Sequence, residues 1–235
     1  MNIALNHPGV RTVLAAVFSM FAAASQAAQP VTACDMTIDG DAYLEADLDC
    51  PTSDFAIRLK GPATLELRGF SILNVPGEAV ACDGKCSVVG PGSIHDAGTG
   101  IRSIRRIDVT DVSFQENGVS IDGNNVQLEN CQIEGGRTGV YVGRKLVLQN
   151  SSISGADEFG VHAGWRLHGN DPCRGGLIRL VNSDVSGNML NPRPEVIPYF
   201  GDVVSCAMPK LDDESSCGTS RKYESDESWG ACSLD

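Results

Sequence analysis

Four polar side chains recur directly after a Gly-Val or Gly-Ile pair, and their types are those that bind or move charge. They are Arg102, Ser120, Tyr141 and His162. Tyrosine and histidine can take up a proton during a reaction, and an arginine can neutralise a carboxylate beside the carbon that loses the proton. We therefore interpret Tyr141 and His162 as candidate catalytic residues and Arg102 as a candidate substrate-binding residue.

Further basic and aromatic residues follow those four positions a few places later. They are Arg105, Arg106, Arg144, Lys145, Trp165, Arg166 and His168. We assign Arg144, Lys145 and Arg166 to the catalytic group, as the residues that hold the carboxylate. Trp165 and His168 are assigned to substrate binding, since an indole ring stacks well on an apolar face. The alternative stays open, because outward residues of a regular fold are polar in any case and basic residues at turns are often only solvated.

A repeat with a period near twenty residues supplies the elements that position these side chains. Its copies begin at Leu65, Ser87, Ile107, Val126, Leu146 and Ile178, and read "LELRGFSI", "SVVGPGSI", "IDVTDVSF", "VQLENCQI", "LVLQNSSI" and "IRLVNSDV". Alternation of apolar and polar residues over the first three places predicts a strand with one buried face. The fifth place always holds a turn former: Gly69, Pro91, Asp111, Asn130, Asn150 or Asn182.

Short strands broken by Asn and Gly at this period predict a coil whose turns stack as parallel sheets, about 4.8 Å apart. The expected outward column is Arg102, Ser120, Tyr141 and His162. Two inward columns are expected, one of Val112, Cys131, Ser151 and Ser183, the other of Leu67, Val89, Val109, Leu128 and Leu148. A leucine-rich repeat is the alternative solenoid, but its leucine spacing is missing.

The stretches "ATLELRGFSI" from Ala63 and "CSVVGPGSI" from Cys86 resemble the first full turns of proteins of the pectin lyase-like superfamily. The resemblance covers roughly Phe55 to Asn188 and implies an all-β, right-handed parallel β-helix. It also implies action on acidic polysaccharide, of the uronate lyase or epimerase type. The alternative is a non-catalytic β-helix protein that binds glycans or surfaces. Both stay open, because the catalytic signatures of polygalacturonases, pectate lyases and bacterial alginate epimerases are missing.

The N-terminus has the composition of a secretory signal peptide over residues 1–27. Arg11 precedes a mostly apolar run over residues 12–24, and a small-x-small cleavage site follows. The run is too short for a membrane-spanning helix, and a buried N-terminal helix is the alternative. We therefore expect secretion to the periplasm or the extracellular space. The mature chain is expected to have a hairpin-like N-terminal cap over 28–54, a β-helix over 55–190 and a C-terminal cap over 191–235.

Nine cysteines lie after the signal peptide, and in an exported chain they are expected to form disulfides. We expect the pairs Cys34–Cys50, Cys82–Cys86, Cys173–Cys206 and Cys217–Cys232. Cys131 remains, at an inward place where a free cysteine behaves as a small hydrophobe. Metal binding by Cys82 and Cys86 is the alternative, although no second ligand pair has zinc-like spacing.

The chain is acidic, with a net charge of −12 that becomes −13 once the signal peptide and its one basic residue are removed. This argues against nucleic acid as a partner, since phosphate binding requires a basic face. We expect a monomer that binds a polysaccharide or cell-envelope glycan, with no membrane span and no cofactor. Calcium binding among Asp35, Asp39, Asp41, Asp47 and Asp49 is the alternative, although no calcium loop is present.

Overall fold

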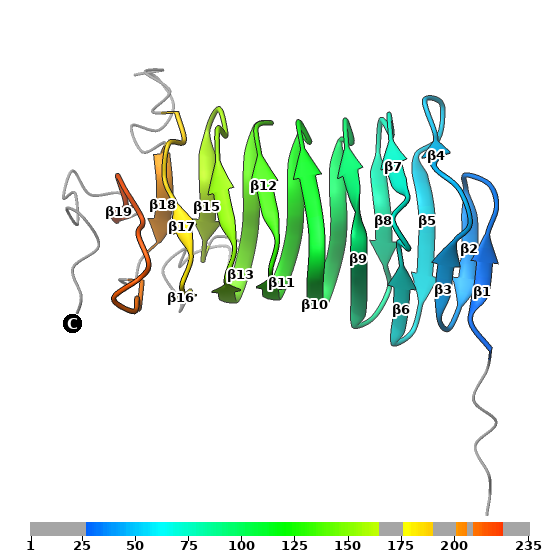
Figure 1. The fold of residues 1–235 in the computed structure, drawn as a ribbon, viewed down its shortest axis with the longest axis horizontal. Coiled ribbons are helices and arrows are strands. Elements are labelled where there is room, and N and C mark those ends of the chain that lie inside the picture. Colours follow the sequence, from blue (N-terminus) through cyan, green and yellow to red (C-terminus); the bar gives the residue numbers. More distant parts are fainter. Residues whose placement is uncertain (1–26, 165–175, 190–200, 206–208, 223–235) are drawn as a thin grey trace, which may run out of the picture.

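A computed structural model describes residues 27–164, 176–189, 201–205 and 209–222 of the chain. These residues form a parallel β-solenoid in which strands of successive turns lie side by side along one axis (Figure 1). Every strand pair among them is parallel, and none of these residues lies in a helix. The predicted parallel β-helix is therefore confirmed, while its right-handed sense stays a prediction from the resemblance.

Three sheets run along the solenoid, because a full turn contributes one strand segment to each. The first sheet contains β2 (Met36–Asp39), β5 (Phe55–Lys60), β8 (Glu78–Cys82), the starts of β10 (Thr99–Gln115), β11 (Val119–Glu129) and β13 (Thr138–Gln149), then β15 (Phe159–Ala163), β18 (Gly201–Ser205) and β19 (Arg221–Lys222). The second sheet contains β1 (Gln29–Val31), β3 (Ala42–Leu44), β6 (Ala63–Glu66), the start of β9 (Cys86–His95), the middle of β10, the ends of β11 and β13, and β16 (Leu177–Val181). The third sheet contains β4 (Leu48–Asp49), β7 (Ser71–Leu73), the ends of β9 and β10, β12 (Gln132–Glu134), β14 (Ser152–Ser154) and β17 (Asp184–Val185).

Apolar side chains that point inward form continuous columns along the axis. One column contains Leu65, Val88, Val109, Leu128, Leu148 and Leu180, each at most 1% exposed. The expected members Leu67 and Val89 do not belong to it. The first two copies of the repeat hold extra residues at the corner that follows, so their strands begin at Ala63 and Cys86, earlier than the pattern indicated.

The second inward column is confirmed at the corner between the second and third sheets. Val112, Cys131, Ser151 and Ser183 stack there, each at most 5% exposed. The outward neighbours Asp111, Asn130, Asn150 and Asn182 all have positive φ, between 45° and 59°. Asn and Asp tolerate this left-handed conformation best among residues with a side chain, which explains why they recur at the fifth place of the repeat.

The segments before and after the repeats extend the same solenoid. Within 28–54, β2, β3 and β4 pair in parallel with β5, β6 and β7, so the expected hairpin is wrong. The segment follows the sheets because its apolar residues alternate in the same way and bury the first turn. Beyond 190, β18 and β19 continue the first sheet, and isolated bridges at Lys210 and Ser216 continue the other two.

Two of the four expected disulfides are confirmed. Cys34 is bonded to Cys50 and Cys82 to Cys86, so these two pairs do not hold a metal. Cys131 is free and buried, as expected, and burial raises the pKa of its thiol to about 11. Cys217 is also disulfide-bonded; Cys173, Cys206 and Cys232 lie outside the described residues. Within the described ranges, no three His, Cys, Asp or Glu side chains converge as metal ligands, and this includes the five aspartates considered for calcium.

Candidate functional site

The candidate column lies on the outer face of the first sheet, with one member different from that expected. Strand register places Arg102, Asp122, Tyr141 and His162 above one another on consecutive turns. Ser120 lies two residues before Asp122 and is fully buried. Successive turns differ in length by one or two residues. At the turn that holds Ser120, alignment of the Gly-Val pair with the preceding Gly-Ile pair is therefore displaced by two places from the strand register. The prediction of Ser120 in the column is therefore wrong.

Tyr141 and His162 form an aromatic pair at one end of the column. Their ring centroids are 5.0 Å apart, and the ring of Phe159 meets His162 edge-on at 4.6 Å. His162 is 4% exposed although it lies on the outward side of the strand. Burial lowers the pKa of its imidazole to about 4, because a charged ring would lose its hydration there. At neutral pH this histidine is uncharged and can accept a proton.

Arg102 is held by two acidic residues. Its Nη1 donates to Glu78 Oε1 at 2.7 Å, and its Nε lies 3.6 Å from Asp122 Oδ2. The hydrogen bond to Glu78 raises the pKa of Arg102. The positive charge is thus already balanced, and Asp122 lies between it and Tyr141 in the column. This arrangement makes Arg102 a poor group for holding a substrate carboxylate beside Tyr141.

The remaining predicted residues lie elsewhere. Lys145 is aligned with Arg106 through Asn125 at the edge of the second sheet, and Arg144 lies at the corner just before it. The sheet therefore changes between Tyr141 and Lys145, so the expected catalytic group is divided between two faces. Trp165, Arg166 and His168 lie outside the described residues, as does most of the insertion between Gly164 and Gly176.

A basic surface occupies the outer face of the second sheet and its corner with the first. We call it the basic strip, defined by Arg105, Arg106, Arg144, Lys145, Arg179 and Lys210. All six side chains are exposed. Arg106 pairs with Asp108 at 2.7 Å, whereas the other five have no carboxylate partner in the part of the chain that the structure describes. Several uncompensated cations thus lie together on a strongly acidic chain.

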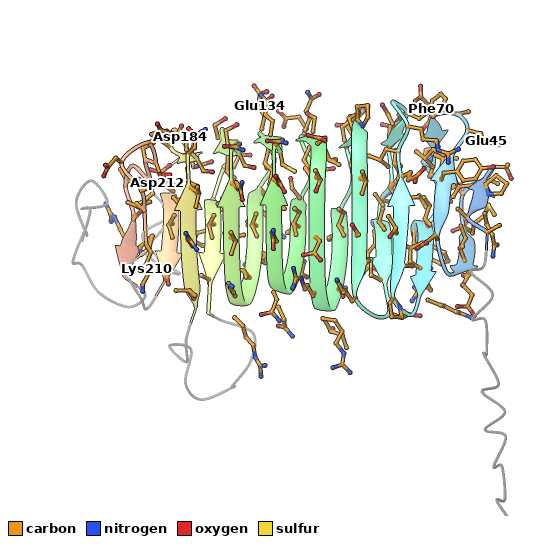
Figure 2. The ribbon with its side chains drawn as sticks, turned by 60° about the horizontal axis from the view of Figure 1, so that its bottom comes forward. Glu45, Phe70, Glu134, Asp184, Lys210 and Asp212 are labelled. Atoms are coloured by element: carbon orange, nitrogen blue, oxygen red, sulfur yellow. A yellow bond between two sulfur atoms is a disulfide. The ribbon has the colours of Figure 1, made fainter. Side chains whose placement is uncertain are left out.

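Several acidic side chains lie along one edge of the solenoid, whereas Asp108 lies beside Arg106 of the basic strip. Figure 2 shows the labelled acids Glu45, Glu134 and Asp184 along one edge of the solenoid and Lys210 away from them. The strip also contains a shallow recess of about 230 Å³, lined in part by Arg106, Gln127 and Lys145. A negatively charged polymer would therefore meet attraction on one face and repulsion along another.

The sequence analysis missed two members of the basic strip. Arg179 occupies the second place of the last repeat, and the register aligns it with Val147 and Gln127. Comparison of the second places of all repeats would have found it. Lys210 pairs with Arg179 through an isolated parallel bridge, in a segment where no copy of the repeat marks its position.

Comparisons with protein-family models, with curated proteins and with solved structures each return no match. Among the described residues, no helix is long and apolar enough to cross a membrane.

Proposed function

We propose that this protein is an exported β-helix protein of the pectin lyase-like type that binds acidic polysaccharide along the basic strip. One observation carries the proposal: five exposed cations without carboxylate partners among the described residues lie together on the second sheet and its corner, in a chain whose net charge is −12. Scattered surface cations on an acidic protein would be expected to pair with the acids around them. Their collection on one face is typical of a surface that binds a polyanion.

The spacing of the strip suits a polymer. Cations on neighbouring turns of a parallel solenoid are separated by about 4.8 Å, roughly the length of one sugar unit. Arg179 and Lys210 are aligned on neighbouring turns, so consecutive uronates can each meet one of them, while Lys145 lies on the preceding turn, two residues along the strand from Val147, the partner of Arg179. Each exposed contact contributes only about 0.2–1 kcal/mol and is screened by salt. Binding should therefore require several sugar units and weaken at high ionic strength.

Catalysis by a uronate lyase or epimerase is the second candidate function. The observation that favours it is the pair Tyr141 and His162, with an uncharged imidazole next to a phenol. Two observations favour binding without catalysis instead. His162 is nearly inaccessible, and the Arg102 charge is balanced by Glu78 and Asp122.

The test measures binding of the mature protein to polygalacturonate and to alginate by calorimetry, at low and at high salt. We expect binding that weakens with salt, and a loss of roughly tenfold in the double variant Arg144→Glu/Lys145→Glu. Lys60→Glu is the matched control, since Lys60 is exposed and has no described carboxylate partner but lies on the first sheet. Equal losses in both variants, or no binding to either polymer, would overturn the proposal.

The same samples distinguish the two candidate functions. A lyase releases an unsaturated uronate that absorbs in the ultraviolet, and an epimerase changes the C5 configuration that NMR detects. Binding without either product supports the non-catalytic function. Product formed by the wild type but not by Tyr141→Phe supports the catalytic one.

A further inference from the structure

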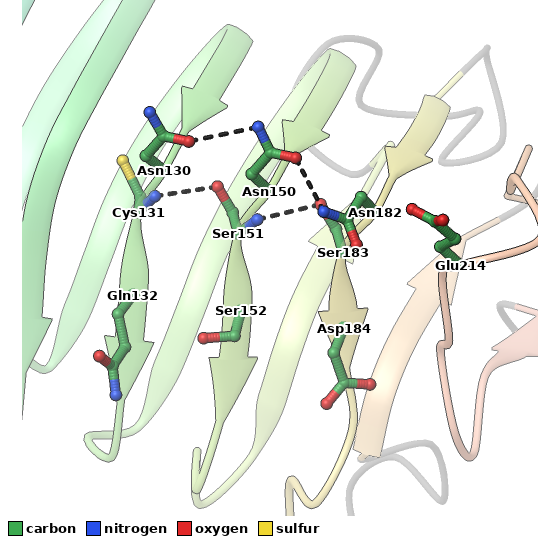
Figure 3. A pocket seen from close by; sticks show the side chains of 10 residues that line it. All are labelled: Asn130, Cys131, Gln132, Asn150, Ser151, Ser152, Asn182, Ser183, Asp184 and Glu214. Carbon is green, nitrogen blue, oxygen red and sulfur yellow. Dashed lines mark hydrogen bonds between the residues drawn. The ribbon is translucent and has the colours of Figure 1, made fainter.

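A second recess, separate from the basic strip, runs along the corner between the second and third sheets (Figure 3). Its volume is about 500 Å³, and it extends over three successive turns. One wall consists of Asn130, Asn150 and Asn182, and the other of Gln132, Ser152 and Asp184. We call this recess the corner groove. Among the residues that the structure describes, its lining contains carboxylates but no lysine, arginine or histidine.

The asparagine wall is a ladder of side-chain amides with one direction. Asn182 Nδ2 donates to Asn150 Oδ1 at 2.9 Å, and Asn150 Nδ2 donates to Asn130 Oδ1 at 3.2 Å. Asn130 Nδ2 in turn donates to Asp111 Oδ1 at 3.0 Å. An amide nitrogen carries two hydrogens, so each ladder residue keeps one N–H for another acceptor. All three asparagines are exposed, and these donors can therefore reach a ligand.

The floor of the groove is rigid. The Ser151 hydroxyl accepts from Cys131 N at 3.0 Å, and the Ser183 hydroxyl accepts from Ser151 N at 3.1 Å. Each hydroxyl also donates to a backbone carbonyl two residues before it, at 2.8 Å. These groups are buried and satisfied, so they hold the two walls in place without binding a ligand themselves.

Two of the three side chains in the opposite wall are still available for hydrogen bonds, whereas both oxygens of the third, Asp184, accept from serine hydroxyls. Gln132, Ser152 and Asp184 are aligned on consecutive turns of the third sheet. Within the described parts of the chain, the side chains of Gln132 and Ser152 make no hydrogen bond. Gln132 is exposed and Ser152 is half-buried. Glu214 lies at one end of the groove and is exposed. Donors and acceptors thus face one another across the recess.

We propose that the corner groove binds an uncharged, hydroxyl-rich glycan chain laid parallel to the solenoid axis. Amides and hydroxyls both donate and accept hydrogen bonds, as sugar hydroxyls do, and their repeat of about 4.8 Å per turn gives two intervals, enough for roughly two sugar units. Glu214 can accept from sugar hydroxyls, and so can Asp184 through its remaining lone pairs, since its two oxygens already accept from the hydroxyls of Ser186 and Ser216. The same carboxylates repel a polyanion, so this ligand differs from that of the basic strip.

The test titrates the mature protein with four neutral β-1,4-linked hexasaccharides, of glucose, xylose, mannose and N-acetylglucosamine, and follows binding by calorimetry. Ser152→Trp fills the groove and should weaken binding of at least one of them about tenfold or more. Ser113→Trp is the matched control, because Ser113 occupies the same outward column of the third sheet two turns earlier. Its affinity should equal that of the wild type.

A milder pair of variants guards against loss of folding. Gln132→Ala should weaken binding severalfold, and Gln115→Ala, on the same sheet outside the groove, should not. Alginate binding through the basic strip should survive in all four variants, which separates failure of this proposal from failure of the first. No binding of any hexasaccharide by the wild type, or equal losses in a groove variant and its control, overturns the proposal.

Discussion

Tyr141 and His162 lie directly above one another on consecutive turns of the first sheet, with ring centroids 5.0 Å apart. The pair is buried at its histidine end, where Phe159 meets the imidazole edge-on. An aromatic stack of this kind makes the stability of the C-terminal turns depend on the protonation of one side chain.

The first prediction concerns the pH dependence of stability. The pKa of His162 is about 4 in the folded protein, against about 6.5 in an unfolded chain, so the unfolded state binds more protons between these values. The free energy of unfolding should therefore fall as the pH drops from 6.5 towards 4, by roughly 3 kcal/mol from this group. Urea denaturation at a series of pH values measures the slope. His162→Gln should reduce this slope, and an unchanged slope in His162→Gln would contradict the prediction.

A second prediction tests the inward columns. Leu128 is completely buried between Val109 and Leu148, so Leu128→Ala leaves a cavity and should cost about 2–5 kcal/mol of unfolding free energy. Val147→Ala removes apolar atoms from the outward face of the same sheet and should change stability by about 0.5 kcal/mol or less. Chemical denaturation of both variants measures the difference. Similar costs would show that the column is not the core of the fold.

The asparagine ladder allows conformational strain to be separated from hydrogen bonding. Asn150 has φ 49° and takes part in two ladder bonds. Asn150→Ala loses both bonds and keeps a Cβ in the left-handed region without the local hydrogen bonding that lets asparagine adopt it, at a further cost of about 1–2 kcal/mol. Asn150→Gly loses the bonds but not the freedom to adopt this φ. The glycine variant should therefore melt at the higher temperature of the two, and the reverse order would exclude backbone strain as the reason for the repeated asparagines.

The two confirmed disulfides should differ in their effect on stability. Cys34 and Cys50 are 16 residues apart, whereas Cys82 and Cys86 are 4 apart. A longer loop loses more entropy in the unfolded chain when a disulfide closes it. For a loop near fifteen residues, this loss stabilises the folded protein by about 3 kcal/mol. Cys34→Ala/Cys50→Ala should therefore lower the melting temperature more than Cys82→Ala/Cys86→Ala does. Equal shifts would indicate that native packing, and not loop closure, sets the contribution.

Much of the fold was predictable because the repeat is local. Alternation within each copy marks the buried face, and Asn130, Asn150 and Asn182 mark the same corner on successive turns. The repeat pattern alone therefore places Cys131 and Ser151 in one inward column. The candidate site was less predictable, since it depends on which residue lies above which.

By itself, the sequence determined the solenoid class, the inward column at the asparagine corner, the free Cys131 and two disulfides, since these follow from patterns within one turn or one short loop. Only the tertiary structure decided the alignment between turns. Bulges between Ser103 and Arg106 and between Gly123 and Asn125 shift the register, and hydrogen bonding between whole strands selects it. That register placed Asp122 beside Arg102 and brought Arg179 and Lys210 together on the second sheet, because a side chain in a stacked coil is positioned by its neighbouring turns.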